Sequence, residues 1–411
     1  MSLKLRAGLM AGLALALPTM ARAEPISLEE AVRRATAASP AIAAQAAGID
    51  AARAGRTQAG VRPNPVLSVD SENIAGTGAY NVFRQAETTV TYAQTIERGG
   101  KRDARIAYAE RDIGVAEASS RISRLNLAQA VQRAFLDLQI AGEVIWLAEK
   151  RLETERAMQV EALRRVRGYR DPVFVETRAA ARISQASLAL EEARSRRNAA
   201  RARLASFWGG KPEDIEVPRG IEKPDEHQHG LASADNNLAA AEVERAQAAV
   251  AVERTRGVQD YTLSGGVRHL RETGDVALVA GISIPLGRFD RNQGNIARAQ
   301  AERQRLEFTA EASRLERLRE LASLRAEAEA ARMRADGIMH DVYPKAQRAL
   351  AQVREGYARG GFRFSDVQDA ADAIIEVQSQ WVEAMTRYRD VLSQIDRLTG
   401  RFDAAAGETQ P

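Results

Sequence analysis

The fold of this chain is decided by the segment at residues 275–284, which reads DVALVAGISI. Apolar side chains occupy every second position from Val276 to Ile284, and most positions between them are small or polar. Strict alternation over about ten residues predicts a β-strand with one apolar face, and it is typical of strands in a membrane β-barrel. The alternative is a soluble hairpin whose apolar face packs on helices.

Three further stretches have the composition of strands. Residues 261–269 precede this segment, and residues 66–74 and 88–96 are joined by a polar, Gly-rich segment in the first half of the chain. The sequence therefore predicts two β-hairpins, at 66–96 and 261–285. Four strands cannot close a barrel and open sheet edges are not tolerated in lipid, so a membrane location requires several chains to pool their strands. Two chains would form a barrel of about eight strands whose interior is filled by side chains. Three chains would supply about twelve strands and leave a pore.

Helical tracts flank the first hairpin. A tract from Ser27 to about Gly60 opens with Ser27 and Glu30, a capping pair. No proline occurs between Gly100 and Pro172, so about 67 residues can form one helix about 100 Å long. We predict that the chain then turns at residues 168–172, where Asp171 caps a return helix that has Pro172 in its first position and runs to about residue 207.

The second half repeats this order at an offset of about 190 residues, with a turn at Gly360 and Gly361. A long helix can be covered by shorter ones only if two of these are stacked end to end, which places the connector near the middle of the long helix. The hairpins and the Gly turns are then at opposite ends. The predicted organisation is a signal peptide (1–23), a first repeat (24–207), an equatorial connector (208–230), a second repeat (231–400) and a tail (401–411).

The N-terminal residues have the pattern of a secretory signal: Lys4 and Arg6, a short apolar run, and an Ala-x-Ala site before Glu24. The apolar run is too short to span a bilayer. The chain has no cysteine, which excludes disulfides and a thiol for a lipid anchor. The formal charge is +4, and without the three basic residues of the signal it falls to +1. Acidic and basic residues are interleaved, so the sequence gives no support for nucleic-acid binding.

Two motifs carry a family resemblance: QTIERGGKR at residues 94–102 and IPLG at residues 284–287. They resemble the strand-to-helix joints of the TolC-like outer-membrane efflux family, in the branch that serves heavy-metal (cobalt-zinc-cadmium type) RND pumps. The resemblance implies a mainly α protein with a small β part, whose homotrimer combines a 12-stranded outer-membrane β-barrel with a periplasmic α-barrel of helical hairpins. It also implies docking to a periplasmic adaptor protein and an inner-membrane RND pump, contact with outer-membrane lipid, and passive conduction without a cofactor or catalytic residues.

The joints are expected to need small residues, because a strand must become a helix within two or three residues. The candidates are Gly99, Gly100, Pro285 and Gly287. We expect the basic residues Arg98, Lys101 and Arg102 to face lipid headgroups or the water beside them. A phosphate-binding loop is excluded, since no glycine precedes Gly100 by five residues and no Ser or Thr follows Lys101.

Asp366 and Asp369 follow the second Gly turn at a spacing that resembles the pore-closing tip of the family. Residues three apart share a helix face, so threefold symmetry would direct six carboxylates at the pore axis, and Asp372 and Glu376 would continue this acidic face. The alternative is ordinary helix capping, by Ser365 and Gln368 together with acids in the first turn. Because only the second turn has these aspartates, we expect the second repeat to move or close the pore.

The two turns are also candidates for adaptor or pump contacts, the alternative being local packing of the turns. The residues concerned are Arg167, Gly168, Tyr169, Arg170 and Asp171 in the first turn, and Gly360, Gly361 and Phe362 in the second. His227 and His229 have a spacing that could bind a metal ion, but a solvated linker readily accommodates two histidines and we predict no metal site. No enzyme motif is present, which leaves a duct for drugs or secreted polypeptides and a soluble periplasmic adaptor as alternative functions.

Overall fold

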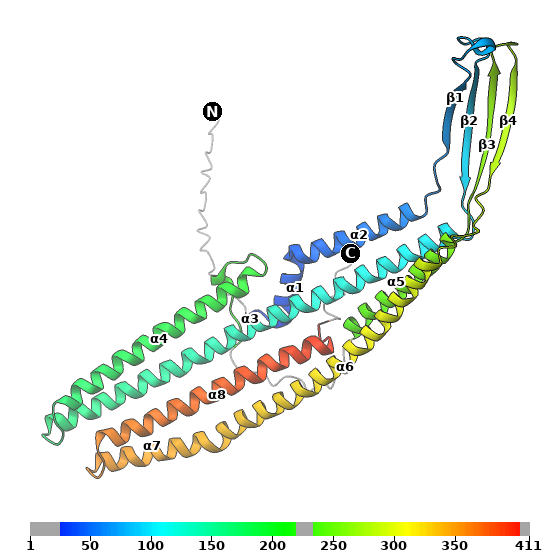
Figure 1. Ribbon diagram of the computed structural model, residues 1–411. Helices are drawn as coiled ribbons and strands as arrows, with labels where there is room; N and C mark the ends of the chain where they lie inside the picture. Colours follow the sequence, from blue (N-terminus) through cyan, green and yellow to red (C-terminus); the bar gives the residue numbers. More distant parts are fainter. Residues whose placement is uncertain (1–24, 219–232, 403–411) are drawn as a thin grey trace, which may run out of the picture.

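The computed structural model describes residues 25–218 and 233–402. Within these ranges long helices carry a four-stranded antiparallel sheet at one end (Figure 1). The predicted signal peptide, residues 219–230 of the connector with His227 and His229, and residues 403–411 of the tail lie outside the described residues. No helix in the described ranges is both long and apolar enough to cross a bilayer.

The first half runs α1 (Leu28–Ala38), α2 (Pro40–Ala59), β1 (Val66–Glu72), η1 (Gly78–Tyr80), β2 (Glu87–Ile96), α3 (Lys101–Arg167), α4 (Phe174–Ser206) and η2 (Pro212–Asp214). The second half runs α5 (Ser233–Arg256), β3 (Tyr261–Leu270), β4 (Val276–Ser283), α6 (Gln293–Gly337), the π-helical turn η3 (Ile338–Val342), α7 (Tyr343–Ala358) and α8 (Phe364–Thr399). The predicted order of helix, hairpin, long helix and return helix therefore occurs twice.

A proline interrupts the tract that the sequence pattern predicts as a single helix before the first hairpin. The tract from residue 27 to residue 60 is two helices, because Pro40 begins α2 and Ser39 is extended, with its hydroxyl accepting a hydrogen bond from the Ile42 amide. A proline lacks an N–H group and disfavours a helical conformation in the preceding residue. In the second half, Pro344 follows the π-helical turn that separates α6 from α7.

The sheet has the order β1-β2-β3-β4, so pairing of β2 with β3 joins the two predicted hairpins. A cross-strand row on one face consists of Val69, Val90, Val267 and Leu278, and all four are exposed. The neighbouring row on the other face includes Asp70, Thr89 and Arg268. The apolar face is thus exposed and does not pack on helices, and β1 and β4 are edge strands without a further partner in the described chain.

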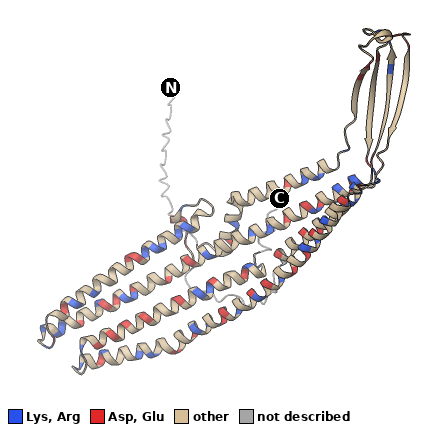
Figure 2. Cartoon of the chain, viewed as in Figure 1, with Lys and Arg blue, Asp and Glu red and all other residues tan. Residues whose placement is uncertain are grey.

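The shorter helices lie along the long ones, as the length argument predicts. In Figure 1, α2 and α4 follow one another along α3, and α5 and α8 follow one another along α6. A hydrophobic cluster near the middle of α3 includes Leu125, Val131 and Leu138, and residues of α1, the end of α4 and Ile215 pack on it. The described part of the connector therefore lies near the middle of the helical region. Figure 2 shows that acidic and basic residues alternate along the helices and are sparse on the strands.

Candidate functional site

The two predicted turns lie at the end of the helices away from the sheet (Figure 1). The first joins α3 to α4 and the second joins α7 to α8. A shared hydrophobic cluster packs beneath them, formed by Met158, Ala162, Val175, Ala179, Leu350, Tyr357, Phe364, Val367 and Ala371. Because this cluster takes side chains from both turns' helices, the two repeats form one packed tip.

A buried polar network ties the two turns together. The Arg165 guanidinium donates from Nε and Nη2 to the two Asp171 carboxylate oxygens at 3.0 and 3.1 Å, and from Nη1 to the Tyr357 carbonyl at 2.5 Å. The Tyr357 hydroxyl donates to Asp171 Oδ2 at 2.5 Å, and its ring lies 4.1 Å from the guanidinium carbon. The predicted cap is therefore wrong: Asp171 binds Arg165 and Tyr357, and α4 begins at Phe174 without a side-chain cap.

This network fixes the protonation states of its members. The Arg165 hydrogen bonds lower the pKa of the Asp171 carboxyl, against the opposing effect of burial. Burial raises the pKa of the Tyr357 hydroxyl, and its hydrogen bond to Asp171 raises it further. At neutral pH Asp171 is therefore a carboxylate and Tyr357 a neutral donor, which is the pairing that the hydrogen bonds require.

Asp366 and Asp369 occupy the first two turns of α8. The Asp366 carboxylate accepts a hydrogen bond from the Arg363 amide at 2.7 Å, and Asp369 is exposed. Helix α8 is thus capped by an acid in its first turn, as the capping alternative proposed. The particular pair it named is wrong, because Ser365 lies inside the helix and Gln368 is fully buried.

Two other acids were expected to extend the same face, but each has a partner. Arg182 of α4 donates two hydrogen bonds to the Asp372 carboxylate, at 2.8 and 2.7 Å, and these hydrogen bonds lower the pKa of Asp372. Arg182 also lies 3.5 Å from the buried Glu155 of α3. Glu376 accepts a hydrogen bond from Gln380. Asp372 therefore holds the two repeats together, and among these four acids only Asp366 and Asp369 stand at the turn itself.

Both turns present exposed apolar side chains beyond this network. Tyr169 is 98% exposed, and Val173, Phe174 and Phe362 are also exposed. Phe362 nevertheless lies against Gly356, where an added Cβ would be 2.2 Å from the ring, so part of its surface packs within the turn. Packing of the turn and an exposed contact surface thus occur together.

The first sheet-to-helix joint has the predicted glycine geometry. Gly99 and Gly100 have φ values of 67° and 75°, and Gly100 is the N-cap of α3. Two of the basic residues there have partners: Lys101 Nζ lies 2.7 Å from Asp260 Oδ2, and Arg102 Nε donates to the Gly60 carbonyl at 2.6 Å. Arg98 and Arg102 are exposed, as expected, although Arg102 also binds the end of α2. The expectation is wrong for Lys101, which is partly buried and ties α3 to the segment before β3.

The second joint contains the predicted Pro285 and Gly287, but its left-handed position is a different residue. Gly287 and Pro285 lie between β4 and α6, but Gly287 does not have a positive φ. The left-handed position is Asn292, with φ of 63°, which is the N-cap of α6. Asn292 stands at the same offset from Gly100 as Gly360 does from Gly168, and asparagine tolerates this conformation better than most residues. That offset is the sequence signal that could have identified it.

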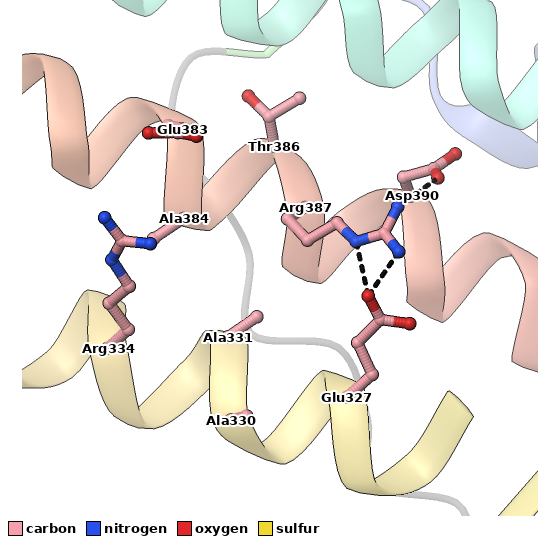
Figure 3. Close-up of a pocket in the computed structure, with 9 residues that line it drawn as sticks. All are labelled: Glu327, Ala330, Ala331, Arg334, Glu383, Ala384, Thr386, Arg387 and Asp390. Atoms are coloured by element: carbon pink, nitrogen blue, oxygen red, sulfur yellow. Dashed lines mark hydrogen bonds and ion pairs between the residues drawn. The ribbon is translucent and has the colours of Figure 1, made fainter. Parts of the chain in front are cut away.

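The helical region also contains an open groove between α6 and α8 (Figure 3). Small side chains, Ala331 and Ala384 among them, form its floor, and Arg387 Nε bridges it by donating to Glu327 Oε1 at 2.6 Å. No group of three or more His, Asp or Glu side chains placed to hold a metal ion is found within residues 25–218 and 233–402.

Comparisons with known proteins agree with this arrangement. Residues 31–210 match the family described as "Outer membrane efflux protein". The chain is 30% identical to the cobalt-zinc-cadmium resistance protein CzcC of Cupriavidus metallidurans over 92% of this chain and 91% of that protein. It is 27% identical to the nickel-cobalt-cadmium resistance protein NccC of Alcaligenes xylosoxydans xylosoxydans over 71% and 69% of the two chains. The crystal structure of the outer membrane protein VceC from Vibrio cholerae superposes with a TM-score of 0.74 at 19% identity, covering 91% and 96%.

Proposed function

Because the chain belongs to the outer membrane efflux protein family, we propose that it is the outer-membrane channel of a tripartite efflux system and conducts its substrate passively to the exterior. The sheet carries this proposal. Its apolar face is exposed and its edge strands β1 and β4 are open, which suits a surface that faces lipid and is completed by other copies. A passive conduit needs no catalytic centre, and none is assigned.

The assembly that fits this sheet is a homotrimer. Three copies would join β1 of one chain to β4 of the next and form a barrel of about twelve strands, with the polar row of Asp70, Thr89 and Arg268 on its inner face. The helices would then extend into the periplasm, after export through a signal peptide cleaved before Glu24. The tip lies far from the sheet and would meet the periplasmic adaptor and the RND pump, through the exposed residues of its two turns.

We assign heavy-metal cations as the substrate class. Support comes from CzcC and NccC, whose names record resistance to cobalt, cadmium, zinc and nickel. A strain that lacks this chain should retain loaded Co²⁺, Zn²⁺ or Cd²⁺, and its tolerance should return with the wild-type gene. An organic dye is the control cargo. If the strain without this chain exports metal normally but exports the dye poorly, the substrate class is organic drugs. Secretion of a polypeptide is measured in the same strains to test the third substrate class.

Asp366 and Asp369 are proposed as the gate of the periplasmic entrance. Both follow the α7–α8 turn, which lies at the end of the helices away from the sheet, and Asp369 is exposed in the single chain. Rings of carboxylates attract cations at a narrow pore, so a trimer with these residues on its axis would bind the cations that pass. In this proposal α7 and α8 are the elements that move, and the Arg165 network holds them against α3.

A further inference from the structure

The apolar face of the sheet continues past the end of β4 into the joint. The alternation that starts at Val276 extends through Ile282 and Ile284 to Leu286, which is 88% exposed. β4 supplies seven of the ten residue steps from Val276 to Leu286. Ten extended steps span about 33 Å, or about 25 Å across a bilayer at a tilt of about 40°, which is the height of the apolar band of membrane barrels. Leu286 therefore lies where that band ends, on the side of the helices.

The same level carries an aromatic ring and a second exposed apolar side chain. Tyr261 pairs with Ile96 in the sheet, and the Arg98 guanidinium carbon lies 4.0 Å from the centroid of its ring. Phe289, three residues after Leu286, is 84% exposed, and the Arg288 guanidinium lies 5.5 Å from its ring. Amphipathic aromatic residues beside cations are typical of the boundary between hydrocarbon and headgroups.

The loop that presents Phe289 is fixed to the end of α5. The Asn292 side-chain amide donates to the Glu253 carbonyl at 2.8 Å and to its carboxylate at 2.7 Å. Gly257 approaches the same loop so closely that a Cβ there would lie 2.6 Å from the Arg291 carbonyl oxygen. These contacts fix the conformation of the turn in which Leu286 and Phe289 are exposed.

Three arginines lie at this end of the sheet, and the Arg98 backbone amide donates to Asp260 Oδ1 at 3.0 Å. Arg98, Arg288 and Arg291 are exposed, and within the described ranges none of them forms an ion pair with an Asp or Glu side chain. They differ in this from Lys101, which pairs with Asp260. Unpaired guanidinium groups at the edge of an apolar band favour phosphate, which they can bind through two parallel hydrogen bonds.

We propose that Arg98, Arg288 and Arg291, together with Leu286 and Phe289, form a binding site for the headgroups of anionic phospholipids in the periplasmic leaflet of the outer membrane. The two apolar side chains enter the acyl region, and the guanidinium groups hold the phosphates above them. This site rests on the proposed membrane location of the sheet. It anchors the joint at a fixed depth, so that the gate end stays at a fixed distance from the membrane.

The test places a fluorescent reporter in the site. The full chain with Phe289→Trp is reconstituted in vesicles that contain phosphatidylglycerol and phosphatidylcholine at equal mole fraction, with one of the two lipids brominated. The quenching of the unsubstituted chain in the same vesicles is subtracted. Phe362→Trp at the tip is the control reporter. We expect strong quenching at position 289 and none at position 362. Each arginine near a membrane surface favours an anionic lipid about fivefold, so three should give a preference for phosphatidylglycerol on the order of 100-fold.

The second arm removes the charges. In the Phe289→Trp background, Arg98→Gln with Arg288→Gln and Arg291→Gln should abolish the preference, whereas Arg167→Gln with Arg170→Gln and Arg354→Gln, at the tip, should retain it. Equal quenching by both lipids in the chain with all three arginines overturns the headgroup site. Absence of quenching at position 289 also overturns the headgroup site and indicates that a second copy of the chain covers this surface. Single-channel currents in the same vesicles separate these failures from failure of the proposed channel.

Discussion

At the residue scale, the two aspartates at the start of α8 differ in what they do within a single chain. Asp366 accepts a hydrogen bond from the Arg363 amide, whereas Asp369 is exposed. We predict that Asp366→Ala lowers the stability of the tip by about 1 kcal/mol through loss of a cap, and that Asp369→Ala changes it by less than about 0.5 kcal/mol. Thermal unfolding of the two purified variants measures this difference.

The same two residues make a prediction about conduction. The double variant Asp366→Ala with Asp369→Ala should raise single-channel conductance and weaken block by divalent or trivalent cations, because it removes six carboxylates from a trimeric entrance. Ordinary capping predicts a change in stability without any change in block. Unchanged currents and unchanged cation block in the double variant would therefore reject the gate and leave the cap.

The Arg165 network predicts an ordered series of losses. Tyr357→Phe removes one hydrogen bond and should cost the tip about 1 kcal/mol, while Arg165→Ala leaves the mostly buried Asp171 carboxylate without its charged partner and should cost about 3 kcal/mol. Trypsin cleavage at the arginines of the turns reports the open population, so cleavage should accelerate about fivefold and more than 100-fold respectively. Equal rates in the two variants would contradict a role for Arg165 as the centre of the network.

The protonation states of this network define a pH range. The pKa of Asp171 is lowered, so its contribution to stability is complete above the ordinary carboxyl pKa of about 4 and is lost as pH falls through the lowered value. The pKa of Tyr357 is raised, so its contribution is complete below about pH 10 and is lost only above the raised value. Spin labels at Tyr169→Cys and Phe362→Cys can report the distance between the two turns, because the chain has no native cysteine. This distance should stay constant from about pH 4 to 10. An increase in the distance near pH 6 would point to another titrating group.

At the scale of the element, the first joint depends on two glycines for different reasons. Both have positive φ, but an added Cβ would lie 2.7 Å from Val258 at Gly99 and in open space at Gly100. Gly100→Ala should therefore cost about 1–2 kcal/mol for backbone strain alone, and Gly99→Ala should cost more. Gly114→Ala, in open space inside α3, is the control and should stabilise the helix by up to about 1 kcal/mol. Thermal unfolding in one detergent ranks the three, and a smaller loss for Gly99→Ala would show that Val258 moves aside.

Elements with a strong local signal could be predicted from the sequence. The alternation at 275–284 and the proline-free run after Gly100 gave β4 and α3, because period and length are properties of the local chain. The local pattern determines the ends of helices and strands less well. The pattern predicts one helix across Pro40, which in fact starts a new helix. It also points to Gly287 at the second joint, whereas the left-handed conformation there belongs to Asn292.

The partners of Asp171 at the tip depend on contacts between the two repeats. Asp171 beside Pro172 has the pattern of a helix start, and a cap needs only neighbouring residues. The observed partners of Asp171 are Arg165 and Tyr357, and Tyr357 comes from the other repeat. A bidentate charged pair with a further hydroxyl donor is stronger than a single cap bond. That competition depends on how the two halves pack, which the sequence pattern around Asp171 does not contain.

At the scale of the whole molecule, pairing of β2 with β3 converts two hairpins into one sheet with open edges at β1 and β4. The chain offers an exposed apolar face and two open edges at one end, and a tied pair of turns at the other (Figure 1). A single copy leaves both edges unsatisfied. The proposed trimer satisfies them and creates a continuous path from the turns to the sheet.

The most direct test of this assembly is the current through the purified protein in a planar lipid bilayer, measured for the wild type and for Asp366→Ala with Asp369→Ala. The double variant is included so that a closed resting gate does not conceal a pore. We predict discrete, ohmic current steps in the double variant, with smaller or rarer steps in the wild type. Folded protein that enters the bilayer and passes no current in either form would contradict the proposal that this chain builds an outer-membrane conduit.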